Sequence, residues 1–321
     1  MISKQKEKKM AMSFDEKYSD AIKRLDEIGM PDYPRQQLDY FADFVELLAL
    51  FSGKDGVSYG DIQDQFFGEP DEKTDAELKD DDEAFLKEIF LRIDERISLY
   101  VNSYPFEKKD NSLMLKGNIS ENEKYYVLLL IASQLSIFKT FNTDLTTDFE
   151  TLSFETLKAY LPNAIVKQFG ENTEYNGSAK VKIQKLSEDV GIDIDDYEVD
   201  QIGDRNHQER GLDVIGWLPF EDNCQNKVVF LGQCACGKKY ESKQHDTRRF
   251  ENYFKFYKTK PQHTLFIPYS LINVSCRKFY GNEIEKDYLV FERKRMVTLL
   301  QGNGVYEQLL SKNLVEKCIN S

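Results

Sequence analysis

Apolar residues recur three or four positions apart through most of the first half of the chain. Leu38, Phe41 and Val45, for example, fall on one face of a helix. The same spacing predicts helices over residues 13–29, 35–51, 83–101 and 121–141. We expect residues 1–145 to form a mostly helical accessory domain that serves docking or oligomerisation.

The pattern changes after residue 142, where short apolar runs punctuated by glycine replace the long helical stretches. These runs predict strands over residues 211–218, 227–235 and 264–268. Helices are predicted over residues 152–169, with a break at Pro162, and over residues 179–190 and 239–257. Helices that alternate with strands are typical of an α/β domain, which we expect over residues 146–321.

Charge is distributed unevenly along a chain whose net charge is −13. Residues 64–83 hold ten acids and two lysines, whereas residues 227–260 hold nine Lys or Arg and three acids. The acidic segment contains Pro70 and no apolar period, so we predict a solvated loop over residues 68–82, an acidic insertion that aids solubility, mimics DNA or docks a partner. The basic segment favours an anionic partner despite the acidic total.

The chain carries no sign of a membrane span or of an oxidising compartment. Its longest apolar run, residues 125–132, is far shorter than the roughly 18 residues of a spanning helix. The basic residues near the N-terminus are not followed by the apolar core of a signal peptide. The five cysteines are an odd number, as expected of reduced thiols. We therefore expect a cytoplasmic protein.

Two polar residues stand out within the predicted strands. Asp213 lies in the strand over residues 211–218, and Gln233 lies near the end of the next one. If the two strands pair as a hairpin, a carboxylate and an amide oxygen converge. Such oxygens are hard ligands, suited to Mg²⁺ or Mn²⁺ that bridges a phosphate. An aspartate in an apolar strand can also be a plain hydrogen-bonding residue, so the inference depends on the pair.

The run Gly211-Leu212-Asp213, followed by a strand that ends in Gln233, resembles the PD-(D/E)XK nucleases of the restriction-endonuclease-like superfamily over about residues 149–296. The resemblance implies an α/β domain with a mixed central sheet. It also implies that Asp213 binds metal and that Gln233 replaces the second acidic residue of the motif. Glu150, or alternatively Glu155, takes the place of the helix glutamate that helps to hold the metal.

The chain departs from the motif at one position, because Ala235 stands where the family has lysine. That lysine would orient the attacking water and stabilise charge on the phosphate. In some members of the superfamily it has moved to the next helix, so Lys238, Lys239 and Lys243 are the candidates here. Lys243 is favoured, because a residue one turn into that helix can project back toward the strand end.

Two other motifs overlap the same strand. Residues 232–238 fit the phosphate-binding pattern G-x-x-x-x-G-K, but Lys239 occupies the position of the Ser or Thr that would bind Mg²⁺. Cys234 and Cys236 suggest zinc, yet no second cysteine pair with ligand spacing is present. The further zinc ligands considered are Cys224, Cys276, His207, His245 and His263. Buried, reduced thiols are the simpler interpretation.

The segment after the candidate site alternates cations with aromatic residues. The cations expected to contact nucleic acid are Arg248, Arg249, Lys255 and Lys258. Phosphate contacts of this kind position a nucleic acid without recognising its sequence. The alternative is an amphipathic helix with a basic solvated face.

Together these features predict a Mg²⁺- or Mn²⁺-dependent DNA endonuclease, in the setting of prokaryotic restriction or anti-phage defence that the resemblance implies. The expected partners are DNA, a protein such as a defence-system ATPase, and further copies of the chain, with no membrane. The alternative is a catalytically silent subunit that keeps the nuclease fold and binds nucleic acid or a partner ATPase. Ala235 favours this alternative.

Overall fold

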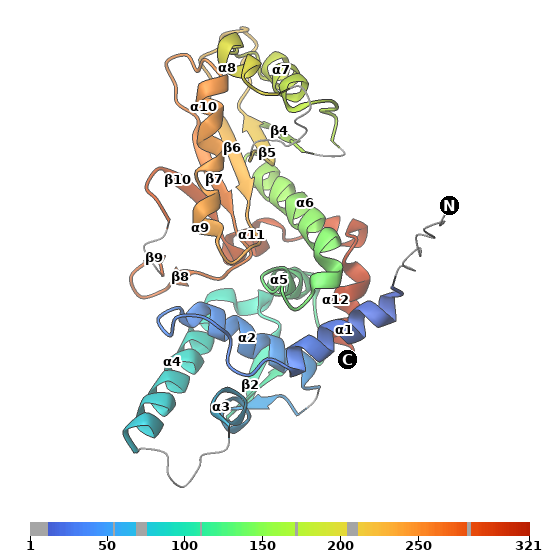
Figure 1. Ribbon diagram of the computed structural model, residues 1–321, viewed down its shortest axis with the longest axis vertical. Helices are drawn as coiled ribbons and strands as arrows, with labels where there is room; N and C mark the ends of the chain where they lie inside the picture. The colour runs from blue at the N-terminus through green and yellow to red at the C-terminus, as the bar shows by residue number, and fades with distance from the viewer. Residues whose placement is uncertain are drawn as a thin grey trace, which may run out of the picture.

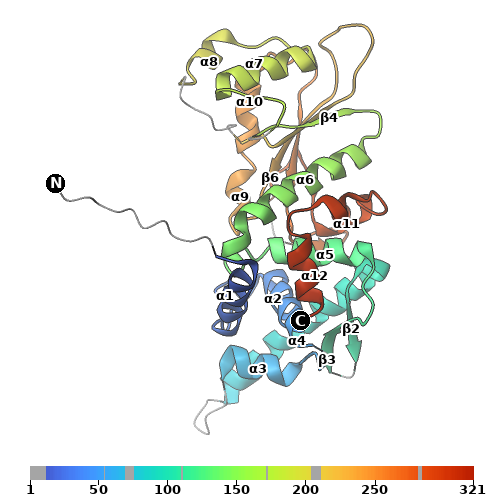
Figure 2. The same cartoon turned by 90° about the vertical axis from the view of Figure 1, so that its right-hand side faces the viewer.

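The computed structural model describes residues 12–53, 55–68, 76–109, 111–170, 173–203, 211–280 and 284–321. It is a mixed α/β structure in which helices gather at one end and a five-stranded mixed sheet lies at the other (Figure 1). Helix α6 (Asn142–Tyr160) runs from the helical end toward the sheet, as Figures 1 and 2 both show. The expected α/β class of the C-terminal half is confirmed.

The first half is mostly helical, as the spacing of its apolar residues predicts. Its helices are α1 (Phe14–Asp26), α2 (Leu38–Phe51), α3 (Tyr59–Phe67), α4 (Ala76–Tyr100) and α5 (Glu121–Ala132). Ser13, Ser58 and Ser120 each begin a helix with a capping box, in which the serine hydroxyl and an acidic side chain three residues later satisfy two backbone N–H groups. The helix expected over residues 121–141 ends at Ala132, and a short 3₁₀ helix follows at Lys139–Phe141. Another short 3₁₀ helix, Val101–Ser103, follows α4.

A small antiparallel sheet also lies in this half and was not predicted. Its strands, in spatial order, are β1 (Val57–Ser58), β3 (Ser112–Leu115) and β2 (Phe106–Lys109). The strands have two to four residues, which is too short for a period of two to show in the sequence.

The prediction of a loop over residues 68–82 is wrong for its last part. Helix α4 begins at Ala76, so residues 76–82 are helical, whereas residues 69–75 lie outside the described part of the chain. Phe85 and Ile89 are buried and anchor the helix from residue 85 onward. Once a helix is nucleated, each added residue gains a hydrogen bond at little cost, so α4 extends toward its N-terminus without an apolar face of its own there.

The five-stranded sheet has the spatial order β10–β7–β6–β5–β4. Its strands are β4 (Ile165–Gln168), β5 (Val214–Trp217), β6 (Val229–Cys234), β7 (Gln262–Phe266) and β10 (Tyr288–Phe291). The first three form an antiparallel meander, and β7 and β10 continue the sheet in parallel with β6. The three predicted strands correspond to β5, β6 and β7.

The helix predicted over residues 152–169 starts earlier and ends sooner than expected. Helix α6 already begins at Asn142 and stops at Tyr160, and residues 165–168 form β4 instead. The stop has a local cause, because the residue before a proline is disfavoured in helical conformation. Leu161, which precedes Pro162, accordingly leaves the helix with φ −122° and ψ 70°.

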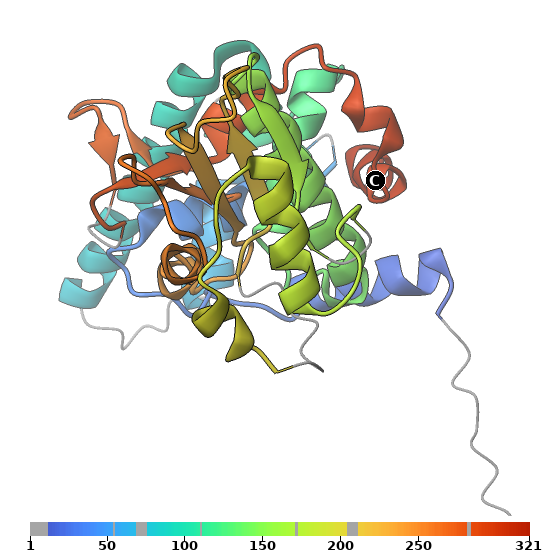
Figure 3. The same cartoon turned by 90° about the horizontal axis from the view of Figure 1, so that it is seen from above.

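Both faces of the sheet are buried. Val214, Phe230 and Phe266 belong to the large core that includes α6, and Gly216 allows Leu157 of α6 to approach β5 closely. Ile215 and Leu231 point the other way, into a core shared with α7 (Ala179–Val190). Figure 3 shows α7 beside the strands from above. The remaining elements of this half are α8 (Asp196–Asp200), α9 (Tyr240–Lys243), α10 (Phe250–Tyr253), β8 (Ile272–Asn273) and β9 (Lys278–Phe279).

The C-terminal helices return to the helical end of the molecule. Helix α11 (Arg293–Leu299) and helix α12 (Lys312–Ile319) pack against α5, and a 3₁₀ turn (Val305–Gln308) lies between them. Helix α12 lies near α1, and the Lys317 ammonium lies 5.6 Å from the centre of the Tyr18 ring. The expected boundary at residue 145 falls within the first turn of α6, and one core cluster takes residues from both sides of it.

None of the helices in the described ranges has both the length and the apolar run that a membrane span needs.

Candidate active site

Asp213 and Gln233 are in direct contact. The Gln233 Nε2 donates a hydrogen bond of 2.6 Å to Asp213 Oδ2, and the same oxygen accepts the backbone N–H of Cys234 at 2.6 Å. Strands β5 and β6 pair as the expected antiparallel hairpin, with Val214 opposite Gly232. The structure therefore brings together the two side chains that the sequence singled out.

The backbone holds Asp213 in place from both sides. Its N–H donates to the Gly232 carbonyl at 2.9 Å, and its carbonyl accepts the Phe169 N–H at 2.7 Å. Gly232 is required for this close pairing, because a Cβ atom there would lie 2.9 Å from the Phe266 ring and 3.0 Å from the Val214 carbonyl oxygen. The register that places Asp213 beside Gln233 thus depends on a glycine.

The Gln233 side chain is only 5% exposed, and its Oε1 has no hydrogen-bond partner in the described structure. A buried polar atom without a partner costs about 1–3 kcal/mol, so a ligand at this oxygen would recover free energy. The amide oxygen and the Asp213 carboxylate are hard donors of the kind that Mg²⁺ and Mn²⁺ prefer, although the Gln233 atom in contact with Asp213 is the amide nitrogen. Across the described ranges, no group of three or more His, Cys, Asp or Glu side chains is arranged to hold a metal ion.

Glu150 lies on α6 and lines a cavity of about 250 Å³ at the end of β6. Cys234 and Cys236 line the same cavity. Burial raises the pKa of both thiols well above the usual value, and the negative charges of Asp213 and Glu150 raise it further. Both carboxylates therefore lie near these two thiols. Glu155, the alternative to Glu150, instead pairs with Lys158 at 3.6 Å.

Of the candidate lysines, Lys243 and Lys239 line this cavity. Lys238 does not line it, since its Nζ lies 4.0 Å from the centre of the Tyr33 ring. Burial at that position lowers the pKa of Lys238. Ala235 occupies the position where the motif has lysine. Its side chain is buried in a cluster with Tyr240 and Leu265, where a cation would lose part of its hydration.

Asp246 is the residue of this region that sequence analysis missed. It begins a 3₁₀ turn (Asp246–Arg249) and is only 17% exposed. Its carboxylate lies 3.7 Å from Lys243 Nζ and 3.3 Å from Arg249 Nη2. No spacing in the sequence signals it, because a turn rather than a regular helix brings it to the strand ends.

The prediction of one continuous helix over residues 239–257 is wrong. The segment forms α9, the 3₁₀ turn and α10, and Phe254 leaves the helical conformation to bridge with Ile194. The aromatic side chains decide this shape, because Phe250, Tyr253 and Phe254 are buried beside α7 and β6. The chain follows their packing at the expense of helical regularity.

Each of the four cations expected to contact nucleic acid has a partner within the protein. Arg248 lies 3.4 Å from Glu285, Arg249 pairs with Asp246, and Lys255 lies 3.7 Å from Asp195. Lys258 lies over the ring of Tyr257. Three of the four cations are therefore partly neutralised, and their contact with nucleic acid stays a prediction.

The structure gives little support to a phosphate-binding loop or to a zinc site. Helix α9 has only four residues, too few for the long helix whose N-terminus cradles a phosphate. All five cysteines are free thiols, and Cys224 and Cys276 are exposed. His245 lies 3.5 Å from Glu285, and His263 is hydrogen bonded to Thr247. His207 lies outside the described residues.

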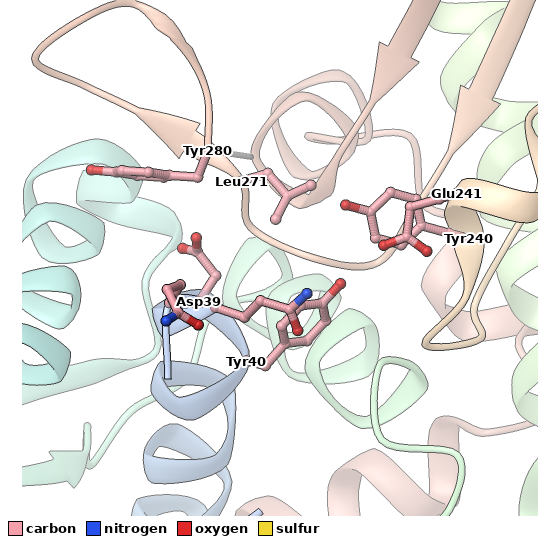
Figure 4. A pocket seen from close by; sticks show the side chains of 8 residues that line it. Asp39, Tyr40, Tyr240, Glu241, Leu271 and Tyr280 are labelled. Carbon is pink, nitrogen blue, oxygen red and sulfur yellow. The ribbon is translucent and has the colours of Figure 1, made fainter. Parts of the chain in front are cut away.

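A second cavity, of about 150 Å³, lies between α2 and α9 (Figure 4). Asp39, Tyr40, Tyr240, Glu241 and Tyr280 line it, and Figure 4 shows their side chains. Burial raises the pKa of Asp39 to about 6, although Arg96 and Arg92 oppose the shift. No residue singled out by the sequence lines this cavity.

No protein-family model, curated protein or solved structure matches the chain. Function must therefore be argued from the site itself.

Proposed function

We propose that the chain is a metal-dependent DNA endonuclease with a restriction-endonuclease-like domain. The observation that carries the proposal is the contact of 2.6 Å between Gln233 and Asp213, in which a buried amide oxygen is left without a partner. The order of elements supports it as well. Helix α6 and strand β4 come first, α7 and α8 follow, and then the pair β5 and β6 leads through α9 and α10 to the parallel strand β7; this α/β arrangement with a mixed sheet agrees with the resemblance.

In this proposal Asp213 and the Gln233 Oε1 hold a divalent cation, with Glu150 nearby. Mg²⁺ or Mn²⁺, when bound, supplies positive charge that polarises a phosphodiester and makes a water molecule more acidic. Lys243 and Lys239 reach the cavity that Glu150 lines and stabilise the negative charge that develops on the phosphate. The free thiols agree with the expected cytoplasmic location, and the anti-phage setting rests on the resemblance alone.

A second candidate function is a silent subunit that binds nucleic acid or a partner ATPase without cleaving. Ala235 favours it, because the chain has no lysine at the motif position. Lys243 has a side chain that is 57% exposed and one long ion pair, so it is held less firmly than a lysine in the strand would be.

The two functions separate in one experiment. Purified protein is incubated with linear and circular DNA in Mg²⁺, Mn²⁺ or EDTA, and DNA binding is measured in parallel. The nuclease is expected to cut only with metal, and the Asp213→Asn variant to bind DNA without cutting. Asp200→Asn, an exposed carboxylate paired with Lys180, is the matched control and should cut normally. Binding by all proteins without any cleavage supports the silent subunit.

A further inference from the structure

Asp246 packs directly on the backbone just before Asp213. Gly211 has φ +84°, and a Cβ atom at this position would overlap the Cβ of Asp246. Only glycine therefore allows the two segments to approach so closely. The same point in space lies 2.9 Å from Asp246 Cγ and 3.1 Å from Gln233 Oε1. The unpartnered amide oxygen and the Asp246 carboxyl group thus both lie beside Gly211, around the same point in space.

The turn that carries Asp246 is fixed to the sheet. Thr247 is fully buried, and its hydroxyl lies 2.9 Å from His263 Nδ1 on β7. His263 Nε2 in turn lies 2.8 Å from Glu251 Oε1 on α10. Because β7 pairs with β6, this chain of contacts holds Asp246 at a constant position relative to Gln233.

The two cations next to Asp246 neutralise its charge only weakly. Lys243 and Arg249 have side chains that are more than half exposed, and ion pairs of this kind contribute about 0–1 kcal/mol. A divalent ion held between oxygen ligands interacts more strongly than either exposed monovalent partner. Asp246 is therefore available to such an ion.

We infer that Asp246 is a third oxygen ligand of the divalent-cation site, next to Asp213 and Gln233. The inference rests on the proposed function for the existence of the site but adds a ligand from a different segment. When the cation binds, Asp246 exchanges its contacts with Lys243 and Arg249 for the metal. Lys243 is then released toward the cavity that it lines, so that metal binding and the positioning of this lysine are coupled.

The test measures Mn²⁺ binding directly, from the electron paramagnetic resonance signal of free Mn²⁺ titrated with protein and no DNA. Asp246→Asn should weaken binding at least tenfold, as Asp213→Asn should, while Asp200→Asn leaves it unchanged. Thermal unfolding checks that each variant is folded. Arg249→Ala, which removes a competing cation, should strengthen Mn²⁺ binding, and this opposite sign cannot come from misfolding.

The inference would be overturned if Asp246→Asn bound Mn²⁺ as tightly as the wild type while Asp213→Asn lost Mn²⁺ binding. The proposed nuclease would remain intact in that case. Failure of the wild-type protein to bind Mn²⁺ at millimolar concentration would overturn it too. Weakened binding in Asp246→Asn without DNA cleavage by the wild type would support the site and reject the nuclease. The readout therefore separates the two proposals.

Discussion

Arg293 forms two parallel hydrogen bonds of 2.9 Å with Asp43, although 250 positions separate the two residues in the chain. Arg293 is fully buried, and Arg96 contacts the same aspartate at 2.7 Å and Glu46 at 2.9 Å. This network joins α11, which follows the last strand of the sheet, to α2 and α4 of the helical end. The two ends of the molecule are therefore coupled through buried charge.

We expect Arg293→Ala to destabilise the whole chain by about 3–5 kcal/mol, because it leaves Asp43 and Glu46 with less compensation for their burial. Urea denaturation followed by circular dichroism measures the change. Arg24→Ala removes a partly exposed ion pair with Asp20 and should change stability far less. Equal, small effects of both substitutions would contradict the importance of the network.

Gly232→Ala should destabilise the sheet by about 1–3 kcal/mol, since the new Cβ would press on the Phe266 ring and the Val214 carbonyl. It should also lower cleavage, because the pairing that places Asp213 beside Gln233 is strained. Gly117→Ala is the matched control, as nothing lies within 4 Å of its Cβ position. Thermal unfolding of both variants measures the difference, and a Gly232→Ala protein as stable as the control would refute the prediction.

Asp39 should make the stability of the protein depend on pH between about 4 and 6. Its pKa in the folded state, about 6, exceeds the ordinary 3.8, so the folded protein binds the proton more tightly than the unfolded chain. The contribution of Asp39 to stability is therefore full below pH 4 and is lost as the pH rises through 6, by roughly 3 kcal/mol at most.

The measurement is the free energy of unfolding of the wild type minus that of Asp39→Asn at several pH values. This difference should fall from pH 4 to pH 7, since the variant has no proton to lose. Carboxylates that do not interact with Asp39 cancel in the subtraction. A difference that is flat or rises over this range would show that Asp39 is ionised in the folded protein at pH 4.

Lys243→Ala should reduce the cleavage rate about 10²- to 10³-fold if this lysine stabilises charge on the phosphate. Lys238→Ala should change the rate little, because its ammonium lies over Tyr33, away from the cavity. Single-turnover cleavage of labelled DNA compares the two. The reverse order of effects would mean that the loop after β6 rearranges on binding DNA.

The sequence allowed the pair Asp213 and Gln233 to be predicted because Gln233 lies in β6 and Asp213 directly precedes β5, its hairpin partner, where alternation of side chains and register follow from local rules. Strand β4 was missed since its four residues are preceded by a helical pattern that Pro162 ends early. Asp246 could not be predicted, because its position depends on how buried Phe250 and Phe254 break a helix into turns. Such packing between distant segments leaves no period in the sequence.

The most direct test of the account is the rate at which wild type, Asp213→Asn and Gln233→Leu cleave labelled linear DNA at saturating Mg²⁺. The account predicts that both variants remain folded and lose at least about a hundredfold in rate, and that EDTA abolishes cleavage by the wild type. Cleavage by the wild type that persists in EDTA, or cleavage by either variant at the wild-type rate, would contradict it.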